Sequence, residues 1–248
     1  MTRVYVTPKR VLWTDGAVSD PEKLLVPNSG QSDIFSDGMC RLQTPGGKTA
    51  SIILDFGCEL HGGLKLVISS CAPSVTPQAR IRFGESVSET CSELKVATKA
   101  FEYVKTPGQE NTATNDHAVR DMELTLPFYG QIEIGSSGFR FVRIDLLTPD
   151  MTINLKEATA ILRYRDIPYL GSFRCDNERL NQIWMTGAYT VHLNMQEYIW
   201  DGVKRDRLIW LGDMHPETST ISAVFGYNES FYASMDLAAK PWPLPSLF

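Results

Sequence analysis

Residues 200–213, with the sequence WDGVKRDRLIWLGD, are the part of the chain richest in side chains that can do chemistry. They include three carboxylates, Asp201, Asp206 and Asp213, together with basic side chains and two tryptophans. Hydrolysis of a glycosidic bond uses one protonated carboxyl group to assist the leaving oxygen and ionised carboxylates to stabilise positive charge at the sugar ring. Aromatic rings complete such sites by packing on the apolar face of the sugar. The segment is therefore a candidate glycosidase site, and the alternative is a solvated turn held by salt bridges between the same charges.

A helical period in the residues after Pro168 predicts the elements that position this segment. A buried helix is indicated by the stripe Leu180, Ile183, Trp184, Gly187, Ala188, Val191 and Met195. Asp176 or Asn177 can cap its first N–H groups, and we expect Trp184 in the core. A second helix is expected after Asp213, with Pro216 near its first turn. A third is expected over residues 228–239, ended by the prolines of residues 241–245.

In the first two thirds of the chain, short apolar segments are separated by Gly, Pro, Ser and Asn. Several of these segments alternate polar and apolar residues, as half-buried strands do. Strands are predicted over residues 51–56, over residues 64–68 after a turn at residues 62–63, and over residues 79–83. In residues 139–146 the apolar residues switch from odd to even positions between Phe141 and Val142. This indicates a bulge or a strand buried on both faces. The simplest fold that accommodates these strands is an antiparallel β-sandwich.

The predicted fold class is mainly β with a C-terminal α segment. A weak helical pattern over residues 89–100 is the one interruption of the strand region. We expect a β-sandwich domain over residues 1–165 and the start of a helical domain over residues 166–248.

Composition and charge limit the partners of the protein. A net charge of -5 argues against nucleic acid, because phosphate binding needs clustered Lys and Arg. Residues 1–12 hold no apolar signal region, and no run is long enough to span a bilayer, so no membrane partner is expected.

The five cysteines do not form a metal-binding or disulfide pattern. They are Cys40, Cys58, Cys71, Cys91 and Cys175, with no C-x-x-C pair and no His at metal spacing. They indicate scattered buried thiols in a reducing compartment, so we expect a cytoplasmic protein without a metal or cofactor. A chain trimmed of its signal peptide would have the same sequence features.

The stretch PYLGSFRCDNERLNQIWMTGAYTVHLNMQEYIWDGVKRDRLIWLGD, residues 168–213, resembles the opening of the catalytic domain of bacterial α-L-rhamnosidases of glycoside hydrolase family 78. In that family a β-sandwich precedes an (α/α)6 barrel. The segments LDFG at 54–57, RFGES at 82–86 and GFRFVR at 138–143 resemble the preceding sandwich. The resemblance covers most of residues 51–226 and implies hydrolysis of terminal α-L-rhamnosides, with inversion and without a cofactor.

The resemblance also implies roles for individual residues. Asp206 occupies the position of the general acid, where many members have the longer Glu. Asp201 and Asp213 match carboxylates that hold rhamnose hydroxyls and stabilise an oxocarbenium-like transition state. Arg205 would orient and tune the acid, and Trp210 would offer an apolar wall.

Two further substrate-binding candidates flank these residues. They are Trp200 and His215, although entry into a helix explains His215 equally well. His192 is expected to be a satisfied helical histidine rather than a catalytic one, and His61 a loop residue beside two glycines.

The general base is missing from the pattern. An inverting enzyme needs it on the opposite face of the sugar, with the two carboxyl groups about 6.5–9.5 Å apart. The family takes it from a later part of the barrel, and neither Glu217 nor Glu229 matches its motif. We therefore expect a fragment that is inactive alone. Its apolar stripes, including Ile221, Val224, Phe225 and Leu237, would lack partners, so we also expect self-association or disorder after Asp213.

Two other functions remain open. One is a non-catalytic, carbohydrate-binding or vestigial fragment, and the other is an (α/α)6 glycosidase with a different sugar preference. If the parent gene continues into a part that encodes the general base, a hydrolase is favoured over the non-catalytic fragment. Activity on a panel of aryl glycosides distinguishes a rhamnosidase from a glycosidase with another sugar preference.

Overall fold

The structure is a computed structural model, and it describes residues 1–27, 30–32, 38–92, 120–204 and 207–240. The chain divides into two compact units, one formed by Arg3–Leu162 and the other by Met1–Thr2 with Arg163–Phe248. The sequence placed the change from sandwich to helices at residues 165/166, three residues further along the chain. The prolines at 241–245 lie outside the described residues.

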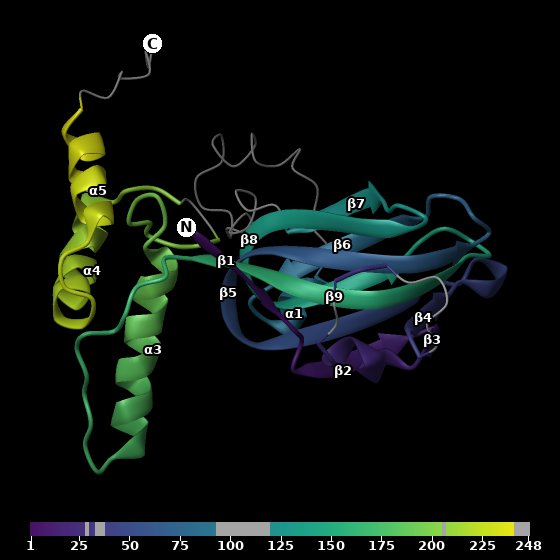
Figure 1. The fold of residues 1–248 in the computed structure, drawn as a ribbon, viewed down its shortest axis with the longest axis horizontal. Helices are drawn as coiled ribbons and strands as arrows, with labels where there is room; N and C mark the ends of the chain where they lie inside the picture. Colours follow the sequence, from purple (N-terminus) through teal and green to yellow (C-terminus); the bar gives the residue numbers. More distant parts are fainter. Residues whose placement is uncertain (28–29, 33–37, 93–119, 205–206, 241–248) are drawn as a thin grey trace, which may run out of the picture. The chain divides into compact units, whose positions relative to one another are not determined.

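The first unit is an antiparallel β-structure (Figure 1). Its strands are β1 (Thr2–Val6), β2 (Arg10–Asp15), β3 (Ala17–Ser19), β4 (Cys40–Gln43), β5 (Ala50–Ala72), β6 (Gln78–Gly84), β7 (Asp121–Thr125), β8 (Gly130–Leu146) and β9 (Thr152–Tyr164). Their order is β3-β4-β9-β5-β8-β6-β7, with β1 on β9 and β2 on β5. Single 3-10 turns lie at Pro21–Leu25 and Pro45–Gly47. The mainly β fold class with C-terminal helices is confirmed.

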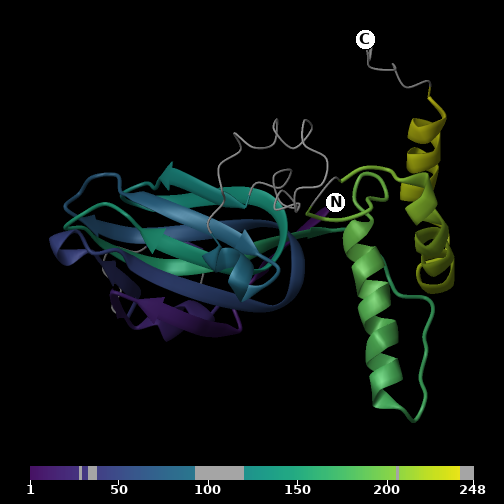
Figure 2. The ribbon, with the colours of Figure 1, turned by 180° about the vertical axis from the view of Figure 1, so that it is seen from behind.

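The central strands β5 and β8 are long and curl, which closes one continuous sheet over its own core (Figure 2). The first part of β5 pairs with β2, its second part pairs with β9, and both parts pair with β8. The predicted turn at residues 62–63 is therefore wrong, because Gly62 and Gly63 continue the strand. A Cβ on Gly63 would lie 2.6 Å from the Ile134 carbonyl oxygen, so glycine permits the close approach of β8. His61 accordingly lies buried in this strand and not in a loop.

The alternating residues of β6 confirm the predicted strand. Ala79, Ile81 and Phe83 are buried in the core. The Phe83 and Phe139 rings meet edge to face with centroids 4.9 Å apart, a favourable aromatic geometry. Phe141 and Val142 of β8 are both buried. Of the two interpretations offered for residues 139–146, a bulge or burial on both faces, the structure shows burial on both faces.

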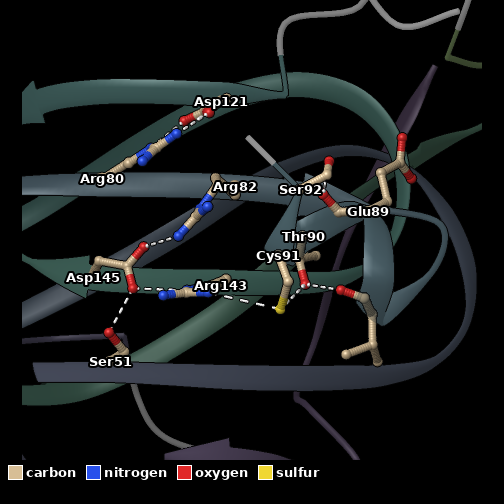
Figure 3. A network of polar contacts seen from close by, with 11 residues as sticks. Ser51, Arg80, Arg82, Glu89, Thr90, Cys91, Ser92, Asp121, Arg143 and Asp145 are labelled. Atoms are coloured by element: carbon tan, nitrogen blue, oxygen red, sulfur yellow. Dashed lines mark hydrogen bonds and ion pairs between the residues drawn. The ribbon is translucent and has the colours of Figure 1, made fainter. Parts of the chain in front are cut away.

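The opposite face of β6 and β8 carries a buried network of charges (Figure 3). Asp145 accepts hydrogen bonds from Ser51 Oγ at 2.6 Å, Arg82 at 2.7 Å and Arg143 at 2.8 Å. Burial alone would raise the pKa of Asp145, but these three donors outweigh it and the pKa is lowered. The polar side of β6 is thus largely removed from solvent, with Arg82 only 4% exposed.

A second buried carboxylate joins β2, β5 and β8. Asp55 is paired with Arg140, at 2.8 Å, and with Arg10. The Arg140 guanidinium, assisted by Arg10, holds the pKa of Asp55 well below its usual range against the opposing effect of burial.

The cysteines are free, and their burial corrects the sequence-based expectation in part. Cys40 and Cys71 are buried, whereas Cys58 and Cys91 are exposed.

The second unit consists of α3 (Glu178–Asn194), α4 (Leu211–Val224) and α5 (Glu229–Ala239), and the short helix α1 (Val87–Cys91) belongs to the sandwich. Asn177 caps α3 by accepting from the Arg179 and Leu180 N–H groups. Asn228 caps α5 in the same manner. Helix α4 starts two residues before Asp213, at Leu211, so Pro216 lies inside the helix, just after its first turn. Of the weak helix expected over residues 89–100, the structure describes only the part that α1 covers.

The buried stripe predicted for α3 is correct only in its C-terminal half. Ala188 is 2% exposed, but Leu180 is 47% and Ile183 57% exposed. Trp184 is half-buried at the edge of the core. The apolar period is present, yet Leu180 and Ile183 stay largely exposed in the part of the chain that the structure describes.

A second core forms where the end of α3, the following loop, α4 and α5 meet. It contains Ala188, Met195, Ile199, Met214, Ile221, Val224 and Phe225. The expectation that Ile221, Val224 and Phe225 lack partners is therefore wrong, because α4 packs on the loop and on α3. None of the described helices is both long enough and apolar enough to cross a lipid bilayer.

Candidate active site

The loop that carries the candidate residues is fixed to the ends of two helices. The Trp200 N–H donates to the Asn194 carbonyl oxygen at the end of α3, at 3.0 Å. The Ile199 N–H donates to Ser234 Oγ of α5, at 2.9 Å. The main chain that enters the candidate segment is thus held by helical anchors, which a site with fixed geometry requires.

Asp201 closes this loop with a reciprocal pair of hydrogen bonds. Its N–H donates to the Leu208 carbonyl oxygen at 3.1 Å, and the Leu208 N–H donates to Asp201 Oδ1 at 2.8 Å. The Arg207 guanidinium lies 5.7 Å from the centre of the half-buried Trp200 ring, and Arg207 has a left-handed φ of 55°. Arg205 and Asp206, the candidate tuning residue and general acid, lie between these anchors and outside the described residues.

Asp213 lies in the first turn of α4, and Glu217 follows it one helical turn later. Side chains four residues apart share a face of a helix. Burial, and then the charges of Asp213 and Asp201, raise the pKa of the half-buried Glu217 to about 7. The charges of Asp201 and Asp213 are therefore near enough to Glu217 to act on its pKa.

Glu217 is the residue whose part in this cluster the sequence did not identify. The sequence offers Glu217 only as a possible general base that lacks the family's motif. A carboxyl group with a pKa near 7 can exchange a proton at neutral pH, whereas ionised carboxylates stabilise positive charge. Its spacing from Asp213 was the available signal, but its burial could not be read from the sequence.

The other candidates surround the carboxylates without entering the cluster. Trp210 precedes α4, is 50% exposed, and lines an open hollow of about 350 Å³ with Leu211 and Leu237. His215 is exposed on α4 and forms no ion pair with a described residue.

Two further candidates are accounted for by structural contacts. Glu229, the other weak candidate for the base, pairs with Arg165 at 2.7 Å. His192 is buried, with Nε2 2.6 Å from the Arg165 carbonyl oxygen and Nδ1 3.2 Å from the Tyr169 hydroxyl. The expected satisfied core histidine is what the structure contains. Within the described ranges, no three His, Cys, Asp or Glu side chains gather closely enough to hold a metal ion.

Comparisons with known proteins agree with the resemblance seen in the sequence. Residues 168–240 match the model of the bacterial alpha-L-rhamnosidase 6 hairpin glycosidase domain. The comparison with curated proteins gave no match.

Solved structures show the same fold. A rhamnosidase from Klebsiella oxytoca with rhamnose bound is 19% identical, with a TM-score of 0.64 over 90% of this chain and 41% of that one. The family 78 rhamnosidase of Bacillus sp. GL1 is 18% identical, with a TM-score of 0.58 over 87% of this chain and 20% of that one. The chain thus spans less than half the length of either structure. Residues 168–240 thus match the bacterial α-L-rhamnosidase six-hairpin glycosidase family, and the chain has the fold of the corresponding part of such enzymes.

Proposed function

We propose that this chain contributes the acid side of the active site of a glycoside hydrolase that removes terminal α-L-rhamnose with inversion. The observation that carries the proposal is the electrostatic effect of Asp201 and Asp213 on Glu217, within the segment that matches the rhamnosidase family model. Ionised carboxylates beside a protonated one form the arrangement that glycosidic cleavage uses.

The individual roles follow from charge and position. Asp206 protonates the leaving oxygen, and Arg205 orients it. Asp201 and Asp213 stabilise the developing positive charge, with the Asp201 carboxylate held in place by the Leu208 N–H. Trp210 offers an apolar wall beside them.

Trp200 and His215 complete the proposed substrate contacts. The proposed general base comes from outside the described residues, since neither Glu217 nor Glu229 matches the family's motif and Glu229 pairs with Arg165. The proposed partner is a rhamnose-containing glycoside.

The test is hydrolysis of an aryl α-L-rhamnoside by the full product of the gene, with the anomer released followed by NMR. We expect β-L-rhamnose to appear first, because inversion places the new hydroxyl on the opposite face. An Asp201→Asn variant should lose at least two decades in kcat. Retention of configuration, or activity only on another aryl glycoside, would contradict the proposal.

Self-association of this chain is a second proposal, and the exposed half of α3 supports it. Leu180, Ile183 and Met185 are each about half exposed, which is unusual for a group of apolar side chains on a monomer. Light scattering should show a dimer or larger species that an Ile183→Ser variant converts to a monomer. A wild-type chain that is monomeric at all concentrations would disprove it.

A further inference from the structure

A second hollow in the helical unit has none of the three carboxyl groups among its described lining residues. It has a volume of about 310 Å³ and lies between the C-terminal half of α4 and the beginning of α5. Its lining includes Thr218, Ser222, Ile221, Phe231, Tyr227 and Tyr232. The lining that the structure describes contains no acidic or basic side chain, so the hollow has no charge with which to attract an ion.

Two exposed tyrosines form one wall of the hollow. The rings of Tyr227 and Tyr232 lie 5.1 Å apart between centroids, with an angle of 33° between their planes. Tyr227 is 80% and Tyr232 51% exposed. The Phe231 and Tyr232 rings meet edge to face, with centroids 5.3 Å apart. Large aromatic faces kept in solvent on a supported platform are typical of surfaces that stack a ligand.

The polar groups of the hollow are available to a ligand. Within the part of the chain that the structure describes, the Tyr227, Tyr232 and Ser222 hydroxyls make no hydrogen bond. Thr218 donates its hydroxyl proton to the His215 carbonyl oxygen at 3.2 Å and keeps its lone pairs for a donor. A covering apolar helix would bury these hydroxyls without partners, which is costly. The lining therefore favours a ligand that brings its own hydroxyl groups.

We propose that this hollow binds a neutral saccharide of one or two rings, stacked on Tyr227 and Tyr232. A sugar ring offers an apolar C–H face to the tyrosines and hydroxyls to Ser222 and Thr218. The absence of charge from the lining selects against acidic sugars, and the volume is near the lower limit of ligand pockets. The site does not depend on the proposed hydrolase, because none of its lining residues belongs to the carboxylate cluster.

The experiment is titration of the whole 248-residue chain by calorimetry and by ligand-observed NMR. The probes are L-rhamnose, D-galactose and lactose, with D-glucuronate as the charged comparison. We expect at least one neutral sugar to bind and D-glucuronate to bind more weakly. Tyr227→Ala and Tyr232→Ala should each weaken binding by roughly three- to tenfold, the usual effect of losing one aromatic contact. Tyr5→Ala is the matched control, since Tyr5 is also 51% exposed but lies on β1.

Two further variants separate this site from the carboxylate cluster and from a protein interface. An Asp201→Asn/Asp213→Asn double variant should bind the sugar as the wild type does. Loss of binding in that variant would assign the sugar to the carboxylates and overturn the proposal. It is equally overturned if no neutral sugar binds, or if Tyr227→Ala/Tyr232→Ala keeps full affinity. Conversion of an associated wild type to a monomer by the tyrosine variants, without a change in sugar affinity, would identify a contact between copies instead.

Discussion

Individual carboxyl groups in this protein are distinguished by their surroundings. Asp145 is held ionised by donors from Ser51, Arg82 and Arg143, although it is buried. Glu217 has carboxylates rather than cations beside it and keeps its proton to about pH 7. The same functional group is therefore a structural anion in the sandwich and a carboxyl group with a raised pKa in the helical unit.

Replacing Asp206 with Asn should reduce kcat of the full gene product by roughly two to four decades, the usual range for a general acid. The loss should be smaller for an aryl rhamnoside whose leaving group departs without a proton. Steady-state kinetics on both substrates provide the test. If the two substrates lose activity equally, the acid is another residue, and Glu217 is the first to examine.

Glu217→Gln should change the pH dependence of stability. The folded pKa of about 7 lies above the ordinary value of 4.5, so the folded state binds more protons than the unfolded state between these pH values. The stabilisation is complete below pH 4.5 and is lost as the pH rises through 7. The variant should therefore be more stable than wild type at pH 8, by on the order of 1 kcal/mol after solvent screening of a half-exposed group.

Thermal unfolding at pH 5 and pH 8 measures this difference. Glu229→Gln is the control, because that side chain is largely exposed and forms only a surface ion pair with Arg165. A Glu217→Gln variant with the same pH profile as wild type would show that the carboxylates do not act on one another.

At the scale of single elements, glycines show where the main chain of one strand or helix is constrained by another. Gly63 in β5 faces the carbonyl oxygens of Ile134 and Gly135 of β8, whereas no atom lies within 4 Å of a Cβ placed on Gly187 in α3. One glycine is required by packing and the other is not.

Gly63→Ala should destabilise the sandwich by roughly 1–3 kcal/mol, because the new Cβ would lie 2.6 Å from backbone that cannot move freely. Gly187→Ala should instead stabilise the helical unit by about 1 kcal/mol through helix propensity. Chemical denaturation followed by circular dichroism measures both. Equal, small effects of the two substitutions would contradict the tight β5–β8 contact.

At the scale of the whole molecule, the two units differ in how completely their apolar faces are covered. The sandwich has a continuous core under β5, β6 and β8. In the helical unit, the apolar stripe at the beginning of α3 is exposed in the part of the chain that the structure describes. Regions with few buried apolar contacts open more often than the rest of a protein.

Hydrogen exchange should therefore be slowest in the sandwich, with residues 81–83 among the best protected amides, and faster in residues 182–195. Exchange read by mass spectrometry on the whole chain gives both values in one experiment. The slowest amides in α3, with rapid exchange in β6, would contradict the different coverage of the two units.

The sequence alone determined the local features of this protein. The cap of α3 at Asp176 or Asn177, the alternation of residues 79–83 and the third helix depend on neighbours in the chain, so their patterns could be recognised directly. The rhamnosidase-like motif of residues 200–213 is local in the same sense. The roles assigned to its individual residues remain predictions.

Only the tertiary structure decided which patterns become buried and which charges meet. Gly62 and Gly63 look like a turn until β8 approaches them, and Arg82 looks exposed until Asp145 pairs with it. Leu180 and Ile183 have a buried pattern without a described partner. Burial and the charges of Asp213 and Asp201 raise the pKa of Glu217. In each case the deciding energy belongs to a contact between distant segments, which a local period cannot encode.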